Sequence, residues 1–231
     1  MSGGEWLSRT ASLIGEAAVE RLQKAKVIIF GVGGVGGYAF EALVRSGVGS
    51  IAVVDSDTVS ESNLNRQIIA TRASLGRLKV EAARERALDI NPDVKITVFP
   101  IFYSDKTEEE IDLGEYDYVI DAIDSVSSKI RLIENAKRKG VRIISSMGAG
   151  NKLNPMGFKV SDVYKTSVCP LARAVRAELK KRGIASLKCV YSEESPAVGK
   201  PGERIPASIA TVPSAAGLLI ASEVIHDITS Q

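Results

Sequence analysis

The chain has 231 residues, a net charge of +2, and a composition that is 45% hydrophobic and 25% charged. This is enough apolar material for a large α/β domain and too little charge for a disordered chain. The two cysteines, Cys169 and Cys189, form no C-x-x-C pair, which argues against a structural zinc site, and their scarcity suits a reducing cytoplasm.

Apolar periodicity predicts alternating helices and strands along the first two thirds of the chain. Helices are expected over residues 11–24, 38–45, 74–90 (with Ser74 as N-cap) and 127–139. Strands are expected over residues 27–30, 51–54, 95–99, 118–123 and 141–145. Continuously apolar strands joined by helices predict a doubly wound, mostly parallel, Rossmann-like sheet.

After residue 150 the pattern becomes less regular. Two short strands, 158–160 and 188–191, surround a helix over 171–181, and Pro213 can start a final helix that ends near residue 228. Because no linker or repeat is visible, we expect a single domain over residues 1–231, with a core over 1–150 and a less regular, mixed extension over 151–231.

Two late segments carry further expectations. The apolar stretch 205–225 is interrupted by Pro206 and Pro213 and contains Glu223, so it predicts a buried or subunit-interface helix and no membrane span. Residues 193–203 are rich in Pro, Gly and charge, and we expect a mobile segment there that could close over a substrate.

A glycine loop follows the first predicted strand. Residues 31–36 read Gly-Val-Gly-Gly-Val-Gly between that strand and a helix, the context in which G-x-G-x-x-G binds phosphate groups. Asp55 ends the second strand, where it can accept hydrogen bonds from a ribose. This indicates a nucleotide site but leaves open whether the nucleotide is ATP or a nicotinamide or flavin cofactor.

The next segment favours a triphosphate. Residues 63–67 read Asn-Leu-Asn-Arg-Gln, and Lys79 follows on the next helix. Arg66 and Lys79 can neutralise phosphate oxygens, and the neighbouring amides can fix ribose and phosphate geometry. Asp124 stands at the carboxyl end of a later strand, where a carboxylate suits Mg²⁺ held between protein and phosphates. Asp121 lies inside that strand, which predicts a structural role.

Together these motifs resemble the adenylating core of the family that includes the ThiF, MoeB and HesA proteins and ubiquitin-activating enzymes. The resemblance implies binding of ATP and Mg²⁺, attack of a carboxylate on the α-phosphate, and release of pyrophosphate. It also implies a homodimer in which Arg9 reaches the ATP of the opposite subunit. The residues assigned on this basis are, for catalysis, Arg9, Arg66, Lys79 and Asp124; for the nucleotide, Gly31, Gly33, Gly34, Gly36, Asp55, Asp57, Asn63, Asn65, Arg66, Gln67, Lys79, Asp124 and Ser125; and for the metal, Asp124.

The last third resembles one branch of that family, the tRNA threonylcarbamoyladenosine dehydratases. The resemblance lies in residues 145–152, 162–166, 169–176, 190–194 and 207–223. It implies activation of the threonyl carboxylate of a modified adenosine in tRNA, followed by ring closure and loss of AMP. Residues 159–190 contain eight Lys/Arg and two Asp/Glu, which modestly supports an RNA partner. The candidates for tRNA contact are Lys152, Lys165, Arg173 and Arg176.

Three alternatives stay open. The first is activation of the C-terminal glycine of a ubiquitin-like sulfur carrier, with Cys169 or Cys189 as a nucleophile in sulfur transfer and the carrier as partner. The C-x-x-C pairs usual in those relatives are absent from this sequence, and Cys189, inside an apparent strand, is expected to serve packing. The second is a nucleotide-binding scaffold without turnover, and the third is a dehydrogenase.

Overall fold

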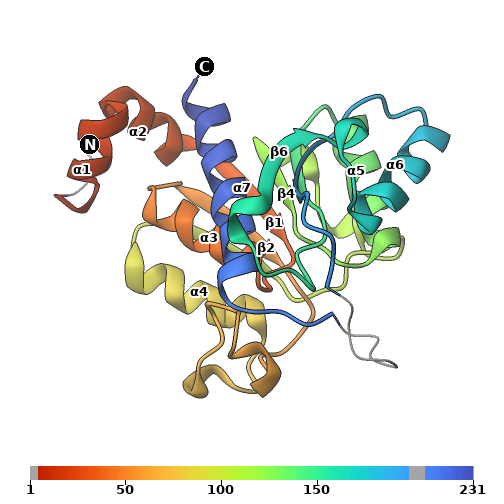
Figure 1. Ribbon diagram of the computed structural model, residues 1–231. Coiled ribbons are helices and arrows are strands. Elements are labelled where there is room, and N and C mark those ends of the chain that lie inside the picture. Colours follow the sequence, from red (N-terminus) through yellow and green to blue (C-terminus); the bar gives the residue numbers. More distant parts are fainter. Residues whose placement is uncertain (1–4, 198–205, 231) are drawn as a thin grey trace.

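The computed structural model describes residues 5–197 and 206–230, and within them seven strands form one sheet (Figure 1). The strand order is β3-β2-β1-β4-β5-β7-β6, parallel throughout except for the antiparallel pair β6 and β7. The strands are β1 (Lys26–Phe30), β2 (Ser50–Val54), β3 (Lys95–Phe99), β4 (Tyr118–Asp121), β5 (Arg142–Ser146), β6 (Phe158–Asp162) and β7 (Lys188–Ser192). The predicted doubly wound, mostly parallel sheet with a mixed extension is confirmed.

Helices cover both faces of the sheet. Alternate residues of β1 enter opposite core clusters: Val27 and Ile29 enter one, Ile28 and Phe30 the other. The first cluster is shared with α2 (Glu16–Lys24), α3 (Gly36–Arg45), α4 (Lys79–Ile90) and α7 (Thr211–Thr229), and the second with α5 (Val126–Arg138) and α6 (Pro170–Lys181). Because β1 is buried on both faces, its sequence is continuously apolar rather than alternating.

Two predicted helices have different boundaries in the structure. The helix expected over 11–24 is broken at Gly15 into α1 (Ser8–Ile14) and α2, because Gly15 has a φ of +87°, which glycine adopts without steric cost. The helix expected from Ser74 begins at Lys79. The Ser74 hydroxyl instead accepts a hydrogen bond from the Thr71 amide at 2.8 Å, within a separate 3-10 turn.

The C-terminal extension is joined closely to the core. Strand β7 pairs with β5, and α7 packs against α3, as Figure 1 shows. At this helix crossing, a Cβ on Gly217 would lie 2.2 Å from the Val35 carbonyl oxygen, so glycine permits the close approach. No helix in the described ranges has the length and apolarity needed to cross a membrane. Of the segment expected to be mobile, residues 198–203 lie outside the described residues.

Candidate active site

The site lies at the carboxyl ends of β1, β2 and β4, where the strand order reverses on either side of β1. Open α/β sheets bind ligands at such a switch point, because the loops diverge there and leave a crevice. The crevice here is a cavity of about 690 Å³, within the usual range for small-ligand sites. Nine of the assigned residues line it: Gly31, Gly33, Gly34, Asp55, Asp57, Arg66, Gln67, Lys79 and Asp124.

The glycine loop forms the floor of this cavity. Gly31 has a φ of +87°, and a Cβ there would lie 2.7 Å from the Ala122 carbonyl oxygen. A Cβ on Gly36 would lie only 1.8 Å from the Gly31 carbonyl oxygen. The loop therefore turns tightly against the end of β4, and α3 starts with no side chain capping its first turn. Its backbone N–H groups and the helix dipole favour an anionic ligand.

Asp55 is held by the backbone of the loops around it. Its Oδ2 accepts the Val32 amide at 2.8 Å and its Oδ1 accepts the Asp57 amide at 2.9 Å. Each carboxylate oxygen has a second lone pair, so the side chain can still accept hydrogen bonds from a ribose.

Basic side chains line the wall beside the glycine loop. Lys79, the first residue of α4, is 6% exposed, and its Nζ donates to Asp57 Oδ2 at 2.7 Å. Arg66 is half-buried, and its Nη1 donates to the Ser62 carbonyl at 2.8 Å and to Asn65 Oδ1 at 2.9 Å. The cationic side chains of Arg66 and Lys79 thus line the same cavity as the glycine loop, where they can bind an anionic ligand.

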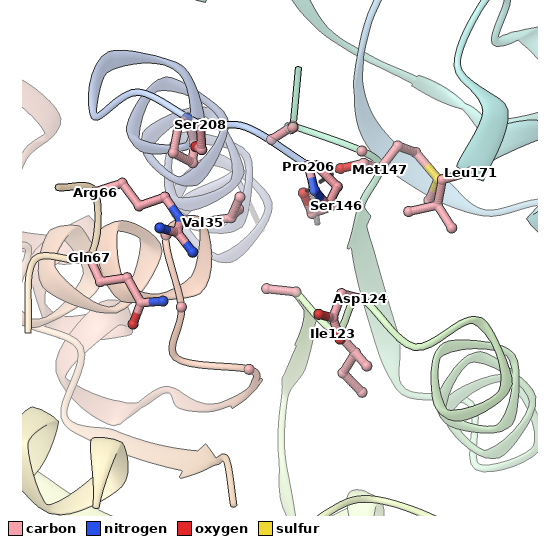
Figure 2. A pocket seen from close by; sticks show the side chains of 18 of the residues that line it. Val35, Arg66, Gln67, Ile123, Asp124, Ser146, Met147, Leu171, Pro206 and Ser208 are labelled. Carbon is pink, nitrogen blue, oxygen red and sulfur yellow. Dashed lines mark hydrogen bonds between the residues drawn. The ribbon is translucent and has the colours of Figure 1, made fainter. Parts of the chain in front are cut away.

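Gln67 lies beside Arg66 on this wall (Figure 2). It is 7% exposed, and its Oε1 has no hydrogen-bond partner among the described residues. This oxygen is buried away from the cavity, whereas the amide nitrogen of Gln67 lies on the cavity side (Figure 2), so the group that a ligand could meet is an N–H donor.

Asp124 lies across the cavity from Arg66 and Gln67, as Figure 2 shows. Its carboxylate is exposed, and no described residue forms a hydrogen bond or ion pair with it. A free carboxylate across a cavity from a basic wall is suitable for a divalent cation. Asp121, by contrast, is fully buried and ion-paired, which confirms its predicted structural role.

A third wall comes from the loop after β5 and the start of α6. It comprises residues 147–152 after β5 together with Cys169, Pro170 and Leu171 at the start of α6. Glu194 fixes this wall by accepting the Leu153 amide at 2.9 Å and the Asn154 amide at 3.0 Å, and these hydrogen bonds lower the pKa of its carboxyl. No sequence motif predicted that this wall borders a cavity. Phe102 and Pro213 also line the cavity, and no sequence pattern assigned either of them to a site.

Five assigned residues do not line the cavity: Arg9, Gly36, Asn63, Asn65 and Ser125. Asn63 accepts the Ser60 amide through its side chain at 3.0 Å, in a reciprocal cap of a 3-10 turn. Asn65 donates to the Ser208 carbonyl at 3.1 Å. In this structure both asparagines therefore organise the loop around Arg66.

The candidate tRNA contacts divide into two kinds. Lys165 and Arg173 are exposed. Lys152 is 3% exposed and donates to the Glu194 carbonyl, while Arg176 is half-buried and donates to the Thr166 carbonyl at 2.9 Å. The structure gives Lys152 and Arg176 hydrogen-bond partners within the fold, and Lys152 also lines the cavity. Contact with tRNA stays a prediction for all four residues.

The cysteines also differ. Cys189 is fully buried, and burial raises the pKa of its thiol to about 12, so the predicted packing role is confirmed. Cys169 is 2% exposed and lines the cavity.

Comparison with known proteins agrees with this geometry. The ThiF family model matches residues 7–231. The chain is 39% identical over 237 residues to the tRNA threonylcarbamoyladenosine dehydratase of Bacillus subtilis, covering 96% of this chain and 93% of the relative. It is 39% identical over 195 residues to the Escherichia coli enzyme of the same name, covering 80% and 72%. The crystal structure of that E. coli enzyme in complex with AMP superposes with a TM-score of 0.91 at 33% identity, covering 100% of this chain and 97% of the other.

Proposed function

The chain belongs to the ThiF family, and we propose that it is an ATP-dependent tRNA threonylcarbamoyladenosine dehydratase. The observation that carries this proposal is the single cavity shared by the glycine loop, the cations Arg66 and Lys79, and the wall of residues 147–152. Nucleotide and substrate can meet there. The relatives that cover most of both chains bear this name.

ATP fits the nucleotide side of the cavity. The uncapped start of α3 and the glycine loop offer N–H donors to phosphate oxygens, and Asp55 offers lone pairs to a ribose. The amide nitrogen of Gln67 offers a further N–H donor at the same wall. Crystal structures of the E. coli relative in complex with ATP and with AMP support this choice of nucleotide.

The chemistry follows from that placement. A carboxylate oxygen of the threonyl group attacks the α-phosphorus, forms the acyl-adenylate, and displaces pyrophosphate. The carbamoyl group of the same nucleoside then attacks the activated carbonyl carbon, closes a ring, and expels AMP, so that the nucleoside loses one water. Arg66 and Lys79 stabilise the negative charge that builds up on the phosphates, and the third wall holds the nucleoside in line.

Mg²⁺ would be held by Asp124. No group of three or more His, Cys, Asp or Glu suited to a metal occurs among the described residues. Mg²⁺ usually keeps several waters and uses one or two carboxylates together with substrate phosphates, so a single carboxylate opposite the glycine loop fits this ion. When bound, the ion would supply positive charge to the phosphates.

Arg9 is proposed to act in the site of a second subunit. It is exposed on α1 and does not line the cavity of its own chain. A homodimer would bring it to the partner's nucleotide. Mixing Arg9→Ala subunits with Asp124→Ala subunits should restore part of the activity, because one site of each mixed dimer would then be complete. No recovery would contradict the shared site.

The substrate is tested by incubating the full chain with ATP, Mg²⁺ and tRNA that carries threonylcarbamoyladenosine. Mass spectrometry of the nucleosides should show the loss of one water, together with release of AMP. Asp124→Ala protein and tRNA without the modification are the controls. If the nucleoside stays intact while the C-terminal glycine of a ubiquitin-like sulfur carrier becomes adenylated, the proposed substrate is wrong. We place the reaction in the cytoplasm, where tRNA is modified.

A further inference from the structure

A fully buried ion pair lies directly behind the Asp124 side of the cavity. The Nζ of Lys129 donates to Asp121 Oδ2 at 2.7 Å, and both side chains are 0% exposed. Neither residue lines the cavity. The proposed chemistry therefore makes no direct use of this pair.

All the polar atoms of the pair have partners. Besides Asp121, the Lys129 ammonium donates to Ser145 Oγ at 3.2 Å and to the Ser146 carbonyl at 3.0 Å. The Ser145 hydroxyl also donates to Asp121 Oδ2. Asp121 Oδ1 accepts the Ile123 amide at 3.1 Å. Lys129 thus uses all three of its donors, and the network is complete without solvent.

This network ties three elements together at one point: the end of β4, the first turn of α5, and the end of β5. The chain between Asp121 and Lys129 is closed into a ring by their ion pair. Residues 122–124 of that ring line the cavity, and so does Ser146, whose carbonyl Lys129 holds. Figure 2 shows Ile123 and Asp124 on the loop after β4, with Ser146 on the adjacent strand.

Stability alone does not account for such a pair. Burying two charges carries a large desolvation cost, and apolar residues of similar volume are often as stable or more stable. What the pair adds is a fixed geometry, because its hydrogen bonds hold a short loop in one conformation. The loop so held carries the free carboxylate that faces the glycine loop.

We infer that Lys129 is a positioning residue, which acts through Asp121 and Ser145 to hold Asp124 in place for the metal–triphosphate complex. This rests on the proposed function only for the identity of the ligand. The positioning itself is a property of the protein without nucleotide. Displacing a reacting or binding group by about 1 Å can cost on the order of 100-fold in rate, so loss of the network should have a large kinetic effect.

The test uses two variants of the full chain. Lys129→Met leaves the Asp121 carboxylate buried without its cation and can prevent folding. The double variant Asp121→Asn/Lys129→Met removes both charges and keeps similar volumes, so it is the variant expected to fold. Arg86→Met is the control, because it also weakens an ion pair with a buried carboxylate, that of Glu41, which is 6% exposed and outside the cavity, while the Arg86 side chain is 35% exposed.

Hydrogen exchange of the nucleotide-free protein is the first measurement. The double variant should exchange faster in the peptide that spans residues 122–125, with protection of β1 and β2 unchanged. The second measurement is ATP binding by calorimetry at varied Mg²⁺, where the half-saturating Mg²⁺ concentration should rise by about ten-fold or more. Arg86→Met should change neither result.

The third measurement is a double-mutant cycle. With Asp124→Asn already present, removal of the Lys129 network should reduce turnover little further, because both changes remove the same contact. The inference would be overturned if the turnover losses of the Asp124→Asn and Lys129-network variants multiplied in the combined variant, while hydrogen exchange at residues 122–125 and the Mg²⁺ dependence of ATP binding stayed unchanged. If wild-type protein does not dehydrate the modified tRNA, the proposed function fails by itself, and exchange and Mg²⁺-dependent ATP binding still decide the role of Lys129.

Discussion

Lys79→Met is the sharpest test of the nucleotide wall. Lys79 is 6% exposed, and its ammonium lies against the cavity with Asp57 as its ion-pair partner at 2.7 Å. Methionine keeps most of the apolar stem and removes the charge. The Asp57 side chain is 67% exposed, so leaving it unpaired should cost at most about 1 kcal/mol of stability.

The expected kinetic effect is much larger than the effect on stability. A lysine about 4 Å from a phosphate oxygen, at an effective dielectric constant of about 20, interacts with it by about 4 kcal/mol. Removal of one preorganised charge-stabilising donor commonly costs about 2.7 to 4 kcal/mol, or about 10² to 10³ in rate. We therefore expect kcat/KM to fall by about 10² to 10³, with thermal stability nearly unchanged.

The assay follows nucleoside dehydration by mass spectrometry at varied ATP. Arg77→Met is the matched control. Arg77 lies two residues before Lys79, forms an ion pair with Glu85, is more exposed than Lys79, and lies outside the cavity. It should keep wild-type kcat/KM within about two-fold, as expected for an exposed pair. A Lys79→Met enzyme whose kcat/KM stays within about three-fold of wild type would refute the assigned role.

Three further predictions concern the walls and the core. Gly36→Ala would place a Cβ 1.8 Å from the Gly31 carbonyl oxygen, so we expect a loss of about 3 kcal/mol or more in urea unfolding; an unchanged midpoint would contradict it. Burial raises the pKa of Cys189 from 9.0 to about 12. Its thiol thus ionises first in the unfolded chain, and the stability it contributes below pH 9 is lost as the pH rises toward 12. Between pH 9 and pH 12 the unfolding free energy of the wild type should fall with pH more steeply than that of Cys189→Ala, by about 1.4 kcal/mol per pH unit. Equal slopes in the two proteins would argue against a buried, neutral thiol. Gly150→Ala would place a Cβ 2.5 Å from Pro206 Cβ, in the third wall; KM for tRNA should rise by about ten-fold with ATP binding unchanged, and the reverse pattern would place that wall on the nucleotide side.

Much of the fold follows from local patterns. Continuous apolar runs between helices predicted a parallel sheet, since strands buried on both faces need apolar residues at every position. The helix over 11–24 was predicted as unbroken, because its apolar spacing continues across Gly15 and a φ of +87° leaves no trace in that spacing. Ser74 failed as a cap for a similar reason. Its hydroxyl is used by Thr71, and the helix starts only where the chain reaches Lys79.

The nucleotide side of the site was predictable for a different reason. A glycine loop and the charges that follow it lie close in sequence and have recognisable residue types, so Gly31 and Lys79 could be assigned to one cavity before their positions were known. The Lys129 network could not be predicted from the sequence. It joins a strand, a helix and a second strand, and it depends on β4 and β5 being neighbours in the sheet. Lys129 alone looks like any polar residue on a helix.

The C-terminal helix gives a last reason why the motifs of the core are not sufficient by themselves. Helix α7 crosses α3 at Gly217, where a Cβ would lie 2.2 Å from the Val35 carbonyl oxygen. One turn earlier, Pro213 lines the cavity, and a Cβ on Gly34 would lie 3.1 Å from the Pro213 Cβ. The glycine loop is therefore in contact with Pro213, which lies 179 positions after Gly34 in the chain. Since α7 also shares the core cluster that contains Val27 and Ile29, the same packing that stabilises the sheet also fixes the position of the glycine loop.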